Sequence, residues 1–226
     1  MRILRAGNEG KRTCHVSCSF FAIHPNINTY RHNIIMRNMT KMTDIEEDAW
    51  CSHFADQLQG KLIKIGEGMT KAEFRSHVIT SAVNILRPGG FQRKKDAASV
   101  KEGPAQGDKI DLYAEGHRMS VAVEYDNDKM IKRKSIQKLL FSGADLCVAV
   151  SKGPDEEREN FACEISCQVQ KALEECGTSA PERDLFLLIL SQDTMLRLQV
   201  FNEDGKTGCE ISKVYPFCSY SRACER

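Results

Sequence analysis

The chain has 226 residues, of which 41% are hydrophobic and 28% are charged, a composition that favours a soluble protein with one buried core. The formal net charge is +1 at pH 7, so any attraction to nucleic acid has to come from local basic segments. The longest apolar run covers residues 185–190 and is far shorter than the roughly 20 residues that span a bilayer, which argues against a membrane role.

The ten cysteines show no Cys-x-x-Cys spacing. Cys14 and Cys18 stand four positions apart, as do Cys163 and Cys167. Structural zinc sites use tighter pairs with histidine partners, so we do not expect one here. Free thiols in a reducing cytoplasm are the expectation, and we predict a cytoplasmic protein.

Residues 1–38 lack any hydrophobic periodicity and do not resemble a secretory signal. We expect this segment to be disordered, or not to be translated at all, because Met36, Met39 and Met42 cluster just before the first helical pattern. A single α/β domain over residues 43–215 and a tail over residues 216–226 complete the predicted organisation.

The domain opens with two helical patterns. The first begins at residue 43 and is expected to stop at Gly60, and the second covers residues 70–86, where Thr70 and Glu73 have the spacing of a capping box. A short strand at residues 91–95 and a polar loop at residues 101–107 follow.

The remaining segments alternate between strand and helix patterns. Two strands, one around Asp111 and one ending at residue 126, are joined by a turn at residues 114–117 and form a hairpin. This order predicts an α/β protein with a mixed sheet flanked by helices. The later segments are a helix at 129–142, a strand at 146–150, a helix at 156–176, a strand at 185–190 and an edge hairpin at 195–201 and 211–215.

Carboxylates gather where the hairpin strands meet. Side chains alternate faces along a strand, so Glu124 and Asp126 point one way and Tyr125 points the other. The turn allows Asp111 to lie across from Glu124. Oxygen ligands of this kind suit Mg²⁺ or Mn²⁺, which keep several waters and leave room for phosphate oxygens. The pattern therefore predicts metal-dependent hydrolysis of phosphodiesters.

This segment resembles the PD-(D/E)XK nuclease superfamily, which has the restriction-endonuclease-like fold. Asp111 matches the first acid of the family motif, and Glu124-Tyr125-Asp126 matches the acid-x-Lys on the next strand, with Asp126 in place of the motif lysine. The resemblance covers about residues 70–190 and rests mainly on the order of the elements. It implies a magnesium nuclease in which Asp111, Glu124 and the backbone carbonyl of Tyr125 hold the metal, and it allows a homodimer.

In some members of the superfamily a lysine from the following helix replaces the motif lysine. Here Lys129, Lys132, Lys134 and Lys138 follow the strand. Lys134 or Lys138 could reach back over the site, and we predict that Lys134 takes this role beside the catalytic carboxylates Asp111, Glu124 and Asp126. Ile136, Leu139 and Leu140 are expected to face the sheet, leaving Lys134, Gln137 and Lys138 outward. Nucleic acid, with DNA favoured, is then expected to contact Arg93, Lys94, Lys132 and Lys138.

Several readings of these residues stay open. Acids at strand ends are often solvated, and Asp126, Asn127 and Asp128 also have the character of helix caps. Glu73 or Glu67 could add to the metal site, although a capping role is favoured for Glu73. The basic run after the strand is equally well read as a solvated helix face. The alternative to an active nuclease is a nuclease-fold protein without catalysis that binds nucleic acid or a protein partner.

Overall fold

The computed structural model describes residues 44–63, 69–95, 99–153, 161–177, 180–190, 194–203 and 206–216. The predictions made for residues 1–38, for the tail after residue 216 and for Glu67 lie outside these ranges.

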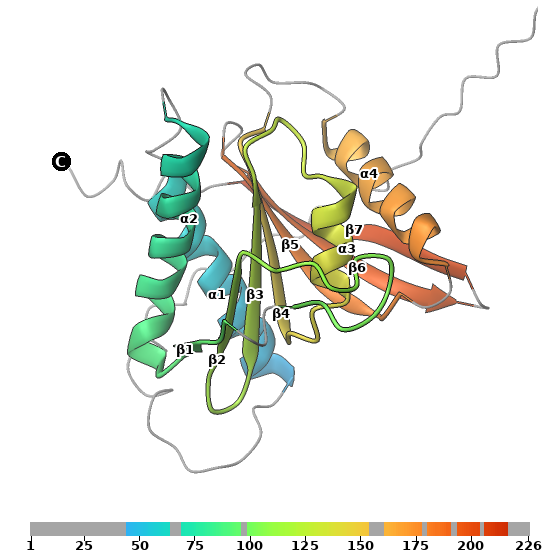
Figure 1. Ribbon diagram of the computed structural model, residues 1–226. Coiled ribbons are helices and arrows are strands. Elements are labelled where there is room, and N and C mark those ends of the chain that lie inside the picture. Colours follow the sequence, from blue (N-terminus) through green and yellow to red (C-terminus); the bar gives the residue numbers. More distant parts are fainter. Residues whose placement is uncertain are drawn as a thin grey trace, which may run out of the picture. The chain divides into compact units, whose positions relative to one another are not determined.

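A mixed sheet forms the centre of the fold (Figure 1), and its seven strands lie in the order of the chain, β1-β2-β3-β4-β5-β6-β7. Strands β3, β4 and β5 run parallel to one another, and the other neighbouring strands pair in antiparallel fashion. The predicted α/β class and both predicted hairpins are confirmed, but the turn of the first hairpin lies after Glu115 and not at residues 114–117, because Ala114 and Glu115 still pair with Val121 and Ser120. The strands are β1 (Gln92–Arg93), β2 (Leu112–Glu115), β3 (Ser120–Asp126), β4 (Leu146–Ser151), β5 (Arg183–Ile189), β6 (Thr194–Glu203) and β7 (Lys206–Pro216).

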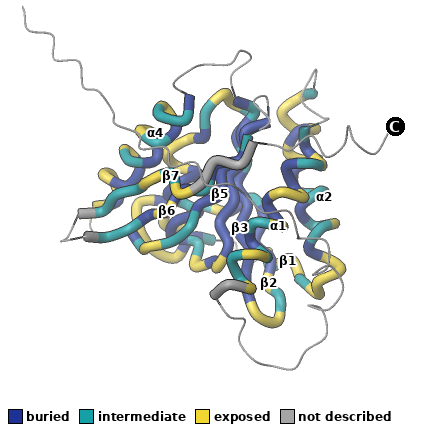
Figure 2. The backbone as a smooth tube through the Cα atoms, turned by 180° about the vertical axis from the view of Figure 1, so that it is seen from behind, coloured by how far each residue is buried: buried dark blue, intermediate teal, exposed yellow. Residues whose placement is uncertain are grey.

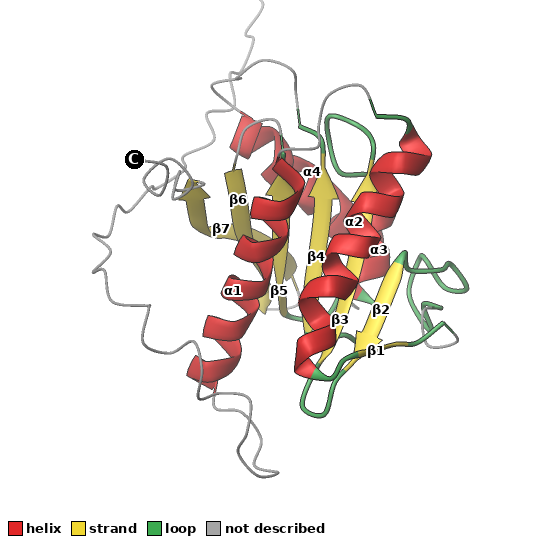
Figure 3. Ribbon diagram, turned by 90° about the vertical axis from the view of Figure 1, so that its left-hand side faces the viewer, coloured by secondary structure: helices red, strands yellow, loops and turns green. Residues whose placement is uncertain are grey.

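Helices cover both faces of the sheet. The helices α1 (Asp44–Leu62) and α2 (Lys71–Leu86) pack on one face, and α3 (Arg133–Leu140) and α4 (Phe161–Cys176) pack on the other (Figures 1 and 3). The parallel strands are consequently buried on both sides (Figure 2), and all six residues of β4 are buried. This is why their sequences read as continuous apolar runs. Within the described residues, no helix combines the length and the apolar character needed to cross a membrane.

The first two helices agree closely with the sequence patterns. Thr70 caps α2: its hydroxyl accepts a hydrogen bond from the Glu73 backbone N–H, and the Glu73 carboxylate accepts one from the Thr70 N–H. These two bonds lower the pKa of Glu73 and confirm its capping role. Gly60 does not end α1, which continues to Leu62, because a single glycine weakens a helix without breaking it when the flanking face is buried.

The helix after β3 begins later than the sequence predicted. It starts at Arg133 instead of residue 129, with Lys132 as its N-cap. The Asp126 carboxylate accepts a hydrogen bond from the Lys132 backbone N–H at 2.8 Å, so this acid ties down the turn before the helix. Gln137 is buried, which corrects its predicted outward orientation. Its side-chain amide donates to the Ala172 carbonyl and to Glu175 of α4.

Candidate functional site

The two acids predicted to hold a metal face each other across the first hairpin. Leu112 pairs with Val123, which places Asp111, the residue before β2, opposite Glu124 of β3. The Asp111 backbone N–H donates to Glu124 Oε1 at 2.9 Å, and the Tyr125 backbone N–H donates to Asp111 Oδ2 at 3.3 Å. The predicted juxtaposition of Asp111 and Glu124, called the acid pair below, is confirmed.

Lys138 of α3 closes the acid pair on its buried side. Its ammonium group forms an ion pair with Glu124 Oε2, and their side chains are 14% and 2% exposed. The same ammonium group donates to the Lys109 backbone carbonyl at 3.0 Å. Lys138 was predicted to point outward and to contact nucleic acid. The outward orientation is wrong, because the Lys138 ammonium lies against Glu124 and its side chain is mostly buried.

The electrostatics of the acid pair follow from this burial. Burial, and then repulsion by Asp111, raise the pKa of Glu124 to about 7, while Lys138 and the Asp111 N–H act in the opposite direction. Burial and the charge of Asp111 likewise raise the pKa of Tyr125. A nearby cation stabilises the ionised form of such a carboxylate, because the cation offsets both the cost of burial and the repulsion by the neighbouring acid.

Asp126 lies on the same face of β3 as Glu124 but has partners of its own. It contacts the backbone N–H and ammonium of Lys132, the latter at 3.7 Å, and accepts a hydrogen bond from Ser135. Burial raises its pKa despite these contacts. No group of three or more His, Cys, Asp or Glu side chains among the described residues is arranged to hold a metal ion. Metal binding would therefore rest on the acid pair and backbone oxygens, for which the Tyr125 carbonyl stays a prediction.

The other predicted residues lie around this centre at varying distances. Lys134 forms an ion pair with Asp108 at 3.0 Å, so the structure does not bring it to the acid pair. Lys132 pairs with Asp128 at 2.7 Å, and Lys94 pairs with Glu115 at 3.8 Å on the edge of the sheet. Arg93 comes closer, since its guanidinium donates to the Asp111 backbone carbonyl at 3.4 Å.

Arg75 of α2 reaches the site although the sequence gave no reason to select it. Its Nη2 atom lies 3.0 Å from Asp111 Oδ1, and its guanidinium carbon lies 5.9 Å from the centre of the Tyr125 ring. Helix α2 and β2 are far apart in sequence, so no local pattern could signal this contact. The acid pair thus has a lysine on the α3 side and an arginine on the α2 side.

Comparisons with family models, with curated proteins and with solved structures found no match to this chain. Function must therefore be argued from the chemistry of the chain's own residues.

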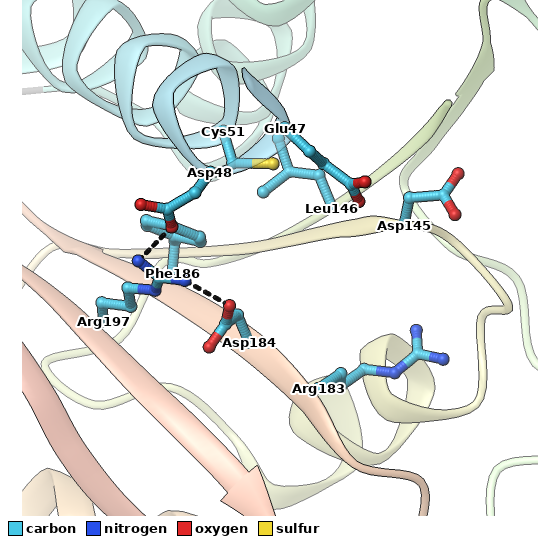
Figure 4. A pocket seen from close by; sticks show the side chains of 9 residues that line it. All are labelled: Glu47, Asp48, Cys51, Asp145, Leu146, Arg183, Asp184, Phe186 and Arg197. Atoms are coloured by element: carbon cyan, nitrogen blue, oxygen red, sulfur yellow. Dashed lines mark hydrogen bonds and ion pairs between the residues drawn. The ribbon is translucent and has the colours of Figure 1, made fainter. Parts of the chain in front are cut away.

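A cavity of about 450 Å³ lies at the other end of the parallel strands. Several of its charged residues have partners within the fold: Arg197 reaches both Asp48 and Asp184 (Figure 4), and Asp145 accepts hydrogen bonds from the Ser120 backbone and hydroxyl. Ligands of α/β sheets usually bind at the carboxyl ends of parallel strands. The acid pair lies toward that end of β3, and the cavity does not, so we take the acid pair as the candidate site.

The donor atoms of the acid pair are of the kind that a small divalent cation prefers. Its side-chain ligands are oxygens only, and Glu124 and the Lys109 carbonyl already hold a cation, the Lys138 ammonium, between them. Hard cations such as Mg²⁺ and Mn²⁺ prefer this donor chemistry and usually bind through one or two carboxylates plus water. An arrangement of this kind can bind a phosphate group and activate water beside it.

Proposed function

We propose that this protein is a metal-dependent nuclease of the PD-(D/E)XK type, acting on nucleic acid and most naturally on DNA. The observation that carries the proposal is the acid pair itself, in which the Asp111 backbone N–H donates to the Glu124 carboxylate at 2.9 Å across the β2–β3 hairpin. Order and direction of the elements support it as well. Helix α2, the antiparallel strands β1 to β3, helix α3 and the parallel strand β4 follow the order expected of a restriction-endonuclease-like core.

Asp111 and Glu124 are the residues that would hold Mg²⁺ or Mn²⁺ in such an enzyme. The bound ion supplies positive charge that polarises the phosphate and makes a water molecule more acidic. One feature of the chain supports this binding: both side chains of the acid pair offer oxygen donors, which Mg²⁺ and Mn²⁺ prefer.

Lys138 is the best candidate for the lysine that Asp126 displaces from the motif. It reaches Glu124 from α3, whereas Lys134 is directed to Asp108. In this role the ammonium would orient the attacking water and stabilise charge that develops on the phosphate. Asp126 then serves to hold Lys132 and the start of α3, which positions Lys138 indirectly.

A nuclease-fold protein without catalysis remains the second candidate. The observation that favours it is the ion pair between Lys138 and Glu124, since a lysine that neutralises the acid can stabilise the fold without any metal. Such a protein would bind nucleic acid or a protein partner with an affinity that does not depend on divalent ions.

Cleavage assays separate these candidates. Purified protein is incubated with single- and double-stranded DNA and RNA in Mg²⁺ or Mn²⁺, beside the variants Asp111→Asn and Glu124→Gln. We expect metal-dependent cleavage that both substitutions abolish. Lys138→Met should lower the rate by about 10²-fold or more, as for the loss of a group that assists proton transfer, whereas the matched control Lys134→Met should retain it. Cleavage that persists in all the acid variants, or none on any substrate, would contradict the proposal.

A further inference from the structure

We propose that Arg75 binds a phosphate of the nucleic-acid substrate at the acid pair, and that its ion pair with Asp111 holds it in place before the substrate arrives. This inference rests on the proposed nuclease function and adds a substrate-contacting residue outside the family motif.

The acid pair is accessible from the side of Asp111. Glu124 is 2% exposed and Lys138 is 14% exposed, so α3 closes one side. Asp111 is 15% exposed, and Arg75 beyond it is 55% exposed. Arg93 marks the same side, with its guanidinium on the Asp111 backbone carbonyl. A phosphate that approaches the acid pair past Asp111 therefore meets the guanidinium of Arg75.

Arg75 is held in place by Tyr125 as well as by Asp111. The guanidinium lies over the ring of Tyr125 at 5.9 Å, and that ring packs at 6.0 Å against Phe74, the buried neighbour of Arg75 in α2. A cation over an aromatic face is attracted to it even without a carboxylate partner. Arg75 can thus stay beside the acid pair when Asp111 has another partner.

The guanidinium of an arginine is well suited to binding a phosphate. An arginine carries five N–H donors in a planar fork that matches two oxygens of a phosphate. In the part of the chain that is described, Asp111 engages Arg75 through Nη2, and further donors of the fork remain for a phosphate. A metal ion held by Asp111 would weaken the attraction between Asp111 and Arg75, which would leave the guanidinium available to the substrate.

This competition gives the proposal a distinctive test. In Arg75→Gln, Asp111 loses a competing cation while the substrate loses a phosphate contact. Affinity for the metal and affinity for nucleic acid should therefore change in opposite directions. An ion pair that merely stabilises the fold would lower both affinities or leave both unchanged.

The experiment uses the full chain with Arg75→Gln and, as a matched control, Arg87→Gln at the other end of α2, where Arg87 is exposed. Binding of a fluorescent DNA oligonucleotide is measured by anisotropy in Ca²⁺ at several salt concentrations, and Mn²⁺ binding is measured by calorimetry without DNA. We expect Arg75→Gln to weaken oligonucleotide binding about tenfold and to reduce the salt dependence by about one phosphate contact. Its Mn²⁺ affinity should rise several-fold. Arg87→Gln should change neither.

The outcomes test the assignment of Arg75 separately from the nuclease proposal. If the wild-type protein binds both Mn²⁺ and the oligonucleotide while Arg75→Gln binds both equally well, the assignment of Arg75 is wrong and the nuclease proposal stands. If the wild type binds neither, both proposals are wrong. Should Arg75→Gln fail to fold, Arg75→Lys replaces it, because lysine keeps the charge but loses the planar fork. Oligonucleotide affinity of Arg75→Lys equal to the wild type would then overturn the assignment.

Discussion

The carboxylate of Glu124 is buried, and its neighbours determine how far burial shifts its pKa. Burial and Asp111 raise its pKa to about 7, while Lys138 and one backbone N–H counteract them. The compensation is incomplete, because a fully compensated carboxylate would titrate near its ordinary value. An additional cation at the acid pair would remove the remaining penalty, which connects the electrostatics of a single residue to the proposed metal site.

Cysteine reactivity provides a residue-scale prediction. Burial raises the pKa of Cys51 to about 12 and that of Cys209 to about 11, so hardly any thiolate exists at pH 8, and alkylation requires thiolate. Cys167 of α4 is exposed. Iodoacetamide labelling of the folded protein, followed by peptide mapping, should modify Cys167 well before Cys51 and Cys209. Denatured protein provides the control, in which the three should react alike. Fast labelling of Cys51 in the folded protein would mean that α1 separates readily from the sheet.

Helix periodicity does not distinguish the two lysines of α3. Lys134 and Lys138 stand four positions apart and lie on one face of the helix, opposite the buried Ile136, Leu139 and Leu140. That Lys138 reaches Glu124 while Lys134 pairs with Asp108 depends on how α3 lies against the hairpin. The contact of Arg75 with Asp111 likewise depends on how α2 lies across the hairpin, and nothing in the local sequence encodes either placement.

Element-scale features were predictable where they follow from local chemistry. The existence of the first hairpin follows from strand alternation, and the start of α2 follows from the Thr70–Glu73 box. The exact register that places Asp111 opposite Glu124 was not predicted, because it depends on β2 continuing through Ala114 and Glu115. The start of α3 at Arg133 was missed, because Asp126 binds the backbone of Lys132 and so holds an extra turn outside the helix. A contact of this kind cannot be predicted from the local sequence pattern.

The loop that leads into β2 gives an element-scale prediction. Gly103 has φ +77°, and a Cβ atom there would lie 2.7 Å from the ring of Phe141, whereas Gly107, with φ +83°, has open space around it. Both alanine variants suffer the strain of a left-handed backbone, roughly 1–2 kcal/mol, but Gly103→Ala also forces the Phe141 ring to move. We expect Gly103→Ala to lower the free energy of unfolding by about 1–3 kcal/mol more than Gly107→Ala. Urea denaturation measures both, and equal losses would show that the loop moves away freely.

For the molecule as a whole, the sheet separates two polar centres. The charged cavity lies where β4 and β5 begin, and the acid pair lies toward the end of β3. The cavity residues join α1 to β5 and β6 through the ion pairs of Arg197 with Asp48 and Asp184. These ion pairs link α1 to the sheet at the cavity, whereas the proposed ligand chemistry lies at the acid pair.

Thermal unfolding tests metal binding by the whole fold. A ligand that binds only the folded state at about 100 times its dissociation constant adds about 2.7 kcal/mol of stability, which for a chain of this size raises Tm by roughly 5–10 °C. We expect Mn²⁺ to produce such a rise in the wild type, with reversal by a chelator. Asp111→Asn should remove the rise, because the amide lacks the charge that attracts the ion. The matched control Asp108→Asn changes an acid that pairs with Lys134 and should keep it. A rise that persists in Asp111→Asn would place the bound ion elsewhere in the protein and leave the acid pair as a structural contact.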